Sequence, residues 1–186
     1  MTSILITGAN RGIGLGLVQQ FIKKEDVKHI FATARDVDAA TELKELGDKR
    51  VVLIQMSVTD DDSIQKAVKQ VEEVVGEDGL DFLINNAGIE KHITIEEPKR
   101  DLAMAHFETN SLGAVMVSAA FHPLLKKAAA RKGHAQIVNI SSTLGSIATG
   151  EGNYPGWDIA IYGMSKAALN RYTVFASKHW QEDNIR

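Results

Sequence analysis

Short apolar runs alternate with helical patterns along the chain. Five runs are β-branched or aliphatic, and several are apolar without alternation, which is typical of strands buried on both faces. These runs are Ser3–Thr7, His29–Thr33, Val51–Met56, Leu80–Asn85 and Gln136–Ile140. Segments with helical periodicity follow them at about Ile13–Lys24, Ala39–Leu46, Asp60–Val75, Leu102–Ala130 and Ile159–Trp180. Strands that alternate with helices in this way predict an α/β fold, with a doubly wound parallel sheet in three layers.

The composition fits one globular domain. The chain has 186 residues, of which 44% are apolar and 24% are charged, enough for one domain with a sizeable core. The formal net charge of −3 gives no reason to expect nucleic acid or an anionic membrane as a partner. Six scattered histidines and no cysteine make a metal site unexpected. Because no apolar run approaches the roughly 20 residues of a membrane span, and the start does not fit a signal peptide, we expect a cytoplasmic protein.

A glycine-rich segment joins the first strand to the first helix. It reads Thr7-Gly8-Ala9-Asn10-Arg11-Gly12-Ile13-Gly14. Glycines at such a junction permit a tight turn and a close approach of the backbone to phosphate, and the helix start supplies free N–H groups. The segment therefore predicts a dinucleotide site. The alternative interpretation is a tight turn that binds nothing.

Near the end of the chain, Tyr162 and Lys166 stand four residues apart in a predicted helix. This spacing places a phenol and an ammonium on one helix face. A fixed cation favours the phenolate form of a nearby tyrosine, so such a pair is suited to general acid–base catalysis. Taken alone, the pair is explained more simply as an ordinary surface pair.

With three further motifs, these features resemble the classical short-chain dehydrogenase/reductase family. The glycine segment has the spacing Gly-x-x-x-Gly-x-Gly, and Asn85-Asn86-Ala87-Gly88 resembles the family's Asn-Asn-Ala-Gly motif. Asn110 resembles the family's helix asparagine, and Ser142 stands where the family places its catalytic serine. The runs Thr7–Leu15, Thr33–Asp36 and Ile140–Gly145 are most similar to carbonyl reductases of the sniffer type.

The resemblance implies a Rossmann-type fold and hydride transfer between a nicotinamide cofactor and a small-molecule carbonyl compound. It implies that Tyr162 donates a proton to the carbonyl oxygen and that Ser142 orients this oxygen. It further implies that Lys166 binds the nicotinamide ribose and that Asn110 relays protons to solvent through a water. Because strand residues alternate in direction, only one of Ser141 and Ser142 should face the site, and Ser142 is the better match.

Charge favours NADP(H) over NAD(H) as the cofactor. Arg35 and Arg11 stand where a basic side chain suits the additional phosphate of NADP, although Asp36 beside Arg35 points the other way. Many family members have an aspartate near the adenine where this chain has Ser57. We therefore expect Val58 to pack on the ring and Asp60 to cap the next helix. The expected cofactor-binding residues are Gly8, Asn10, Arg11, Gly12, Ile13, Gly14, Arg35, Ser57, Val58, Asn86, Ala87, Gly88, Tyr162 and Lys166.

The sequence stops soon after the tyrosine helix. Family members continue with a sixth strand, a substrate lid and a last strand, and we expect none of these here. The prediction is a single dinucleotide-binding domain over residues 1–186, incomplete at its C-terminus, with an exposed sheet edge. We expect the stretch Thr149–Trp157 to form one wall of the site, with Tyr154 and Trp157 as possible lining residues.

Three functions compete at this point. The first is an NADP-dependent carbonyl reductase with the catalytic residues Asn110, Ser142, Tyr162 and Lys166. The second is a non-catalytic dinucleotide-binding or regulatory protein. The third is a protein-interaction module that uses the long apolar helices Leu102–Ala130 and Ile159–Trp180. The resemblance implies a homodimer through these helices, for which the alternative is packing against the sheet.

Overall fold

The computed structural model describes residues 1–94, 96–148 and 159–186. Five parallel strands form one sheet in the order β3-β2-β1-β4-β5. The strands are β1 Thr2–Ile6, β2 Val27–Ala34, β3 Val51–Gln55, β4 Phe82–Asn85 and β5 Gln136–Asn139. The predicted α/β fold is thus confirmed, with small differences at the strand ends. The strand order reverses between β1 and β4, and ligands of such folds bind beyond the carboxyl ends of the strands at this point.

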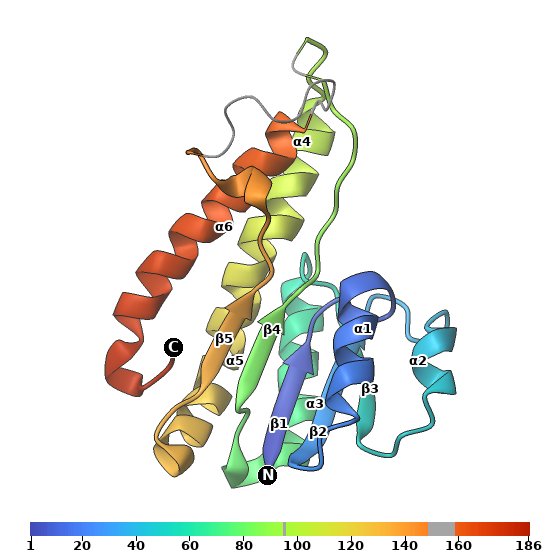
Figure 1. The fold of residues 1–186 in the computed structure, drawn as a ribbon, viewed down its shortest axis with the longest axis vertical. Coiled ribbons are helices and arrows are strands. Elements are labelled where there is room, and N and C mark those ends of the chain that lie inside the picture. The colour runs from blue at the N-terminus through green and yellow to red at the C-terminus, as the bar shows by residue number, and fades with distance from the viewer. Residues whose placement is uncertain (95, 149–158) are drawn as a thin grey trace.

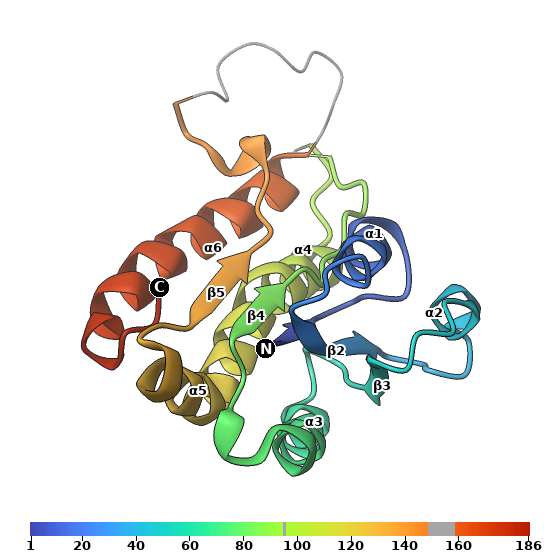
Figure 2. The same cartoon turned by 60° about the horizontal axis from the view of Figure 1, so that its bottom comes forward.

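Helices cover both faces of the sheet. They are α1 Gly12–Phe21, α2 Thr41–Glu45, α3 Asp61–Val75, α4 Arg100–Phe107, α5 Gly113–Lys132 and α6 Ala160–His179, with short turns η1 Gly76–Asp78, η3 Thr143–Gly145 and η4 Gln181–Asp183. Figure 2 shows α1 on one side of the sheet and α3 with α5 on the other. The first turns of α4 and α6 lie together beyond the carboxyl ends of the strands (Figure 1). Among the described residues, no helix is long and apolar enough to cross a membrane.

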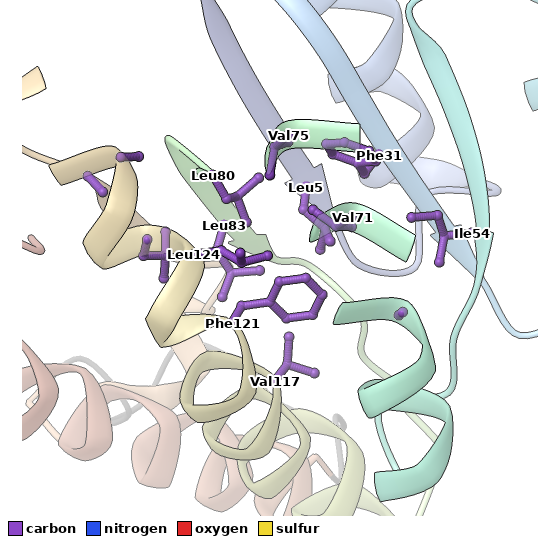
Figure 3. Close-up of a cluster of buried hydrophobic side chains, with 14 of the residues drawn as sticks. Leu5, Phe31, Ile54, Val71, Val75, Leu80, Leu83, Val117, Phe121 and Leu124 are labelled. Carbon is purple, nitrogen blue, oxygen red and sulfur yellow. The ribbon is translucent and has the colours of Figure 1, made fainter. Parts of the chain in front are cut away.

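Strands β1, β2 and β4 are buried on both faces, as their apolar sequences predict, whereas β3 and β5 at the two edges are only partly buried. Alternate residues of β1 point into different cores: Leu5 packs with α3 and α5, whereas Ile4 packs with α1. Figure 3 shows Phe121 of α5 between Leu83 of β4 and Val117 of its own helix. This ring is fully buried, so α5 packs against the sheet along its inner face.

The predicted helix Leu102–Ala130 is not a single α-helix. A π-helical turn, η2 Glu108–Leu112, separates α4 from α5, and the helical path begins earlier, at Arg100. Such a turn carries one more residue per hydrogen-bonded ring than an α-helix and is frequent at functional sites. Apolar periodicity over the whole segment does not reveal it.

The end of the chain pairs with the edge of the sheet. Ile185 pairs with Ala135 in a parallel bridge, and Ile137 N donates to Arg186 O at 2.8 Å. The last residues form an isolated bridge beside the five-stranded sheet, and they cover part of the edge that was expected to be exposed. Burial explains the pairing, because Ile185 is only 2% exposed and joins the core on the α5 side of the sheet. The predicted loop Thr149–Trp157, with Tyr154, lies outside the described residues.

Candidate active site

The glycine-rich segment forms a tight turn between β1 and α1. Gly8 has a φ of +62°, a conformation that L side chains rarely adopt. A β-carbon on residue 14 would lie 2.5 Å from the Gly8 carbonyl oxygen, so the helix can approach the turn only with glycine there. Arg11 precedes α1 and provides no side-chain cap. The first N–H groups of α1, which have no partner within the helix, are therefore available to an anionic ligand.

Asn86 and Thr7 fasten this turn to the end of β4. The Asn86 Nδ2 donates to the carbonyl oxygens of Thr7 at 2.9 Å and Gly8 at 3.0 Å. In return, the Thr7 hydroxyl oxygen accepts from the backbone N–H groups of Asn86 and Ala87, each at 2.9 Å. The two strand ends at the reversal point of the sheet are thus held together by four hydrogen bonds.

A cavity of about 780 Å³ opens over this turn. Its lining includes most of the predicted cofactor-binding residues, namely Gly8, Asn10, Arg11, Gly12, Ile13, Arg35, Ser57, Val58, Asn86, Ala87 and Gly88. Ile89 and Thr109 also line it and were not predicted. Gly14 lies beneath the turn, and Tyr162 and Lys166 are outside this lining. The volume is in the range of small-molecule and cofactor sites.

Two arginines are among the residues that line the cavity. Arg11 and Arg35 both line it, and within the described ranges neither side chain forms a hydrogen bond or an ion pair. The carboxylate of Asp36 accepts from the backbone N–H groups of Asp38 at 2.9 Å and Ala39 at 3.1 Å. Asp36 therefore holds the turn after β2, while the guanidinium groups are available to a ligand.

The two residues predicted to lie near the adenine are also found at the cavity. Ser57 and Val58 line the cavity, and a β-carbon on residue 113 would meet the Val58 side chain at 2.9 Å. The close approach of α5 therefore fixes Val58. Asp60 caps α3, accepting from Ser63 N at 2.9 Å, as predicted.

Tyr162 and Lys166 lie on one face of α6, one turn apart. The Lys166 Nζ is 5.8 Å from the centre of the Tyr162 ring and donates to the Ile140 carbonyl oxygen at 2.7 Å. Lys166 is only 4% exposed, and this burial lowers the pKa of its ammonium. The bond to Ile140 uses one of the three N–H donors, so two remain for a ligand.

The two serines after β5 have different partners. The Ser141 hydroxyl donates to Asn170 Oδ1 of α6 at 2.6 Å, whereas Ser142 caps the start of η3 and its hydroxyl oxygen accepts from Leu144 N at 3.2 Å. The η3 turn packs directly on α6, because a β-carbon on residue 163 would lie 2.7 Å from the Leu144 carbonyl oxygen. Ser141 is thus committed to holding α6. Among the described residues, the Ser142 hydroxyl hydrogen has no acceptor.

Asn110 is buried in η2 and fastens the chain after β4. Its Oδ1 accepts from Ile89 N at 2.7 Å, and its Nδ2 donates to Ile89 O at 2.8 Å and to Ser165 Oγ at 3.0 Å. Both amide hydrogens are therefore engaged, and on this side chain only the second lone pair of Oδ1 remains for a water in the predicted relay. Ser165 in turn donates to the Tyr162 carbonyl oxygen at 2.7 Å.

Gly88 joins the cavity to this polar group. It lines the cavity, and a β-carbon on it would lie 3.3 Å from Asn110 Oδ1 and 3.7 Å from Lys166 Nζ. Sequence reasoning missed Thr7 and Ser165, which connect the motifs. The sequence offered one indication of them, because Thr7 directly precedes the motif residue Gly8 and Ser165 directly precedes Lys166. Among the described residues, no group of three or more His, Cys, Asp or Glu side chains is placed to hold a metal.

Comparison with known proteins agrees with this geometry. The family model for short chain dehydrogenases matches residues 2–186. An uncharacterised oxidoreductase of Schizosaccharomyces pombe is 38% identical over 168 residues, which are 89% of this chain and 62% of that protein. The NADPH-bound carbonyl reductase from chicken fatty liver superposes with a TM-score of 0.95 at 38% identity, over all of this chain and 73% of that one. The carbonyl reductase Sniffer of D. melanogaster gives 0.92 at 36% identity, covering 77% of its chain. This chain belongs to the short-chain dehydrogenase family.

Proposed function

We propose that this chain binds NADPH and reduces a small-molecule carbonyl compound, with Tyr162 as the proton donor. The observation that carries the proposal is the position of Gly88, between the cavity and the groups of Asn110 and Lys166. One residue thus separates a dinucleotide-sized cavity from a buried lysine, which shares a helix face with Tyr162. The similarity to the NADPH-bound chicken enzyme supports the same choice of cofactor.

The residues present fit a dinucleotide with an additional phosphate. The free N–H groups at the start of α1 and the glycine turn suit the pyrophosphate, because Gly12 lines the cavity and a β-carbon there would meet nothing within 4 Å, which leaves the turn open to close approach. Arg11 and Arg35 suit the additional phosphate, since their guanidinium groups are unengaged within the described ranges. Val58 provides an apolar surface for the adenine. Bound NADPH would supply the hydride for the carbonyl carbon.

The side chains around Tyr162 would handle the proton. Tyr162 donates its hydroxyl proton to the carbonyl oxygen as negative charge develops there, and Ser142 donates a second hydrogen bond to the same oxygen. The Lys166 ammonium stabilises the phenolate that remains and binds the nicotinamide ribose through its unused N–H donors. Proton return from solvent then runs through a water on Asn110 Oδ1 and Lys166 to Tyr162.

One set of measurements separates this function from non-catalytic dinucleotide binding. NADPH and NADH are titrated by nucleotide fluorescence, and NADPH oxidation is followed with quinones, diketones and aromatic aldehydes. We expect turnover that is lost in Tyr162→Phe while NADPH binding persists. Tyr172→Phe is the matched control, because it removes the other phenolic hydroxyl on α6 among the described residues. Binding without turnover, unchanged by Tyr162→Phe, would show a dinucleotide-binding protein that is no enzyme.

A cytoplasmic location and a homodimer belong to the same proposal. For the dimer, the supporting observation is the outer face of α6, where Val174 is 48% and Phe175 58% exposed. Sedimentation of the purified protein would test it, and a monomer at micromolar concentration would contradict it.

A further inference from the structure

His106 is fully buried in α4, and both of its ring nitrogens are hydrogen-bonded. Nδ1 lies 2.8 Å from the Leu102 carbonyl oxygen, and Nε2 lies 2.9 Å from the backbone nitrogen of Lys91. A carbonyl oxygen only accepts and a backbone N–H only donates, so the proton is on Nδ1 and the lone pair on Nε2. Two backbone groups therefore hold the ring as one neutral tautomer.

The bond to Lys91 fixes the chain after β4 at a second point. Asn110 binds both backbone groups of Ile89, and His106, one turn earlier in the helical path, binds Lys91. The segment Gly88–Lys91 is thus fastened to one helix by two side chains. Because Gly88 and Ile89 line the cavity, these two side chains also fix one of its walls.

The same imidazole also touches Tyr162. The ring centres are 6.4 Å apart and the ring planes meet at 78°, an edge-to-face arrangement. Such contacts have a preferred geometry, so the imidazole restricts how the tyrosine ring can turn. Since the imidazole is itself fixed by two hydrogen bonds, the orientation of Tyr162 depends on the same residue that anchors the cavity wall.

We infer that His106 is a positioning residue, which keeps the Gly88–Lys91 wall and the Tyr162 ring in one mutual arrangement. It acts through these two elements and does not itself exchange a proton with the substrate. The inference deepens the proposed function and rests on it for its kinetic part. Its structural part, the anchoring of Lys91, can be measured without turnover.

Two substitutions separate the two contacts. His106→Phe keeps a ring against Tyr162 but removes the acceptor for Lys91. His106→Gln keeps a side-chain oxygen as an acceptor but removes the ring. His134→Gln is the control, because His134 is exposed and stands just before the amino end of β5, whereas the site lies beyond the carboxyl ends of the strands. Thermal melting shows which variants fold. If His106→Gln does not fold, His106→Asn takes its place.

The first measurement is amide hydrogen exchange of the cofactor-free protein by NMR. In His106→Phe the Lys91 amide should exchange about tenfold faster than in the parent, because its hydrogen bond is lost. The Ile89 amide, held by Asn110, is the internal reference and should stay within about threefold. In His106→Gln the Lys91 amide should be restored toward the parent rate. An unchanged Lys91 amide in His106→Phe would overturn the inference.

The second measurement is steady-state kinetics against the carbonyl substrate found for the parent. His106→Gln should lower kcat about tenfold with little change in NADPH affinity, because the tyrosine ring is less well oriented. His106→Phe should mainly raise the KM for NADPH, because the Gly88–Lys91 wall of the nucleotide cavity is released while a ring still contacts Tyr162. If both variants keep the kcat and KM of the parent, the positioning role is overturned. The same holds if both variants lose activity equally and only in proportion to their lower melting temperatures. A parent without any turnover would instead refute the proposed function, and the exchange measurement would still decide the anchor.

Discussion

Gly145 lies so close to Lys166 that a β-carbon on residue 145 would come within 2.8 Å of the lysine's carbonyl carbon. The η3 turn therefore rests directly on the part of α6 that carries Tyr162 and Lys166. Since Ser142 caps the start of this turn, the spacing between the serine and the tyrosine depends on the absence of a side chain at residue 145.

Gly145→Ala should therefore impair both stability and turnover. The added methyl group has backbone atoms as neighbours, which cannot move away cheaply, so we expect a loss of about 1–3 kcal/mol in unfolding free energy. Urea unfolding and kcat would be measured on the same preparations. Gly16→Ala is the matched control, because a β-carbon there meets nothing within 4 Å, and helix propensity predicts equal or higher stability. Equal behaviour of the two variants would contradict the packing argument.

Arg35→Ala should weaken NADPH binding far more than NADH binding. A hydrogen bond to a charged phosphate contributes about 1.5–3 kcal/mol, which corresponds to a Kd for NADPH raised by about one to two orders of magnitude. The Kd for NADH should stay within about twofold, because it lacks the phosphate. Fluorescence titration of both nucleotides provides the comparison.

Lys44→Ala is the control for this prediction, since Lys44 is also basic and follows β2 but does not line the cavity. Equal weakening of both nucleotides by Arg35→Ala would refute the assignment of the phosphate to this side chain. A similar selective loss in Arg11→Ala would show that the two arginines share the phosphate.

Lys166→Met should abolish turnover and raise stability at neutral pH. Burial lowers the pKa of Lys166, so the folded protein binds this proton less well than the unfolded chain does. The cost of the buried charge is therefore present below the folded-state pKa and disappears as the pH rises toward the unfolded value. Methionine removes this cost, and we expect a gain of about 1 kcal/mol by urea unfolding. Exposed Lys178→Met should change little, and a clear loss of stability in Lys166→Met would count against the argument.

Asp48→Asn should destabilise the protein in a pH-dependent way. The Arg50 guanidinium donates to the Asp48 carboxylate at 2.8 and 3.0 Å and holds its pKa at about 2, below the ordinary 3.8. A lowered carboxylate pKa stabilises the fold above the unfolded value, and this contribution is lost as the pH falls from about 4 to 2. Urea unfolding should show a deficit of up to about 1 kcal/mol at pH 7 that vanishes in acid.

Asp38→Asn is the matched control for Asp48→Asn, since its carboxylate also faces a basic side chain but is 97% exposed. Its effect should be close to zero at every pH. A deficit in Asp48→Asn that is the same at pH 7 and pH 2 would show that the charge of this carboxylate is not the cause.

The parallel sheet could be predicted because several strand sequences are apolar at consecutive positions. Such sequences are typical of strands covered by helices on both faces. The sequence also predicted most of the cavity, since glycine spacing and strand ends specify where backbone meets ligand. The helix Leu102–Ala130 shows the limit of this reasoning. Apolar periodicity reports which residues are buried on average, and a single π-helical turn changes one hydrogen-bond ring without removing that pattern.

Side chains that hold other side chains were harder to find. Nothing in the sequence around His106 indicates its role. Its partner at Lys91 is a backbone N–H, and every residue other than proline has one. The pairing of Ile185 with Ala135 is similar, since contacts across fifty positions depend on how α6 is placed. Sequence motifs thus located most residues that line the cavity, whereas contacts made by ordinary backbone groups, such as the Lys91 N–H, leave no mark in the sequence.

The π-helical turn sets the rotational phase between two faces of one continuous helical path. An α-helix turns by about 100° per residue, so removing one residue from Glu108–Leu112 would rotate everything before it by that angle relative to α5. His106 and Val117 lie on opposite sides of this turn, one against Tyr162 and the other in the core. Deleting one residue there would not change which residues lie before and after the turn. His106 could then no longer contact Tyr162 while Val117 remains in the core. The length of this short turn is therefore as closely constrained as the identity of any side chain around Tyr162.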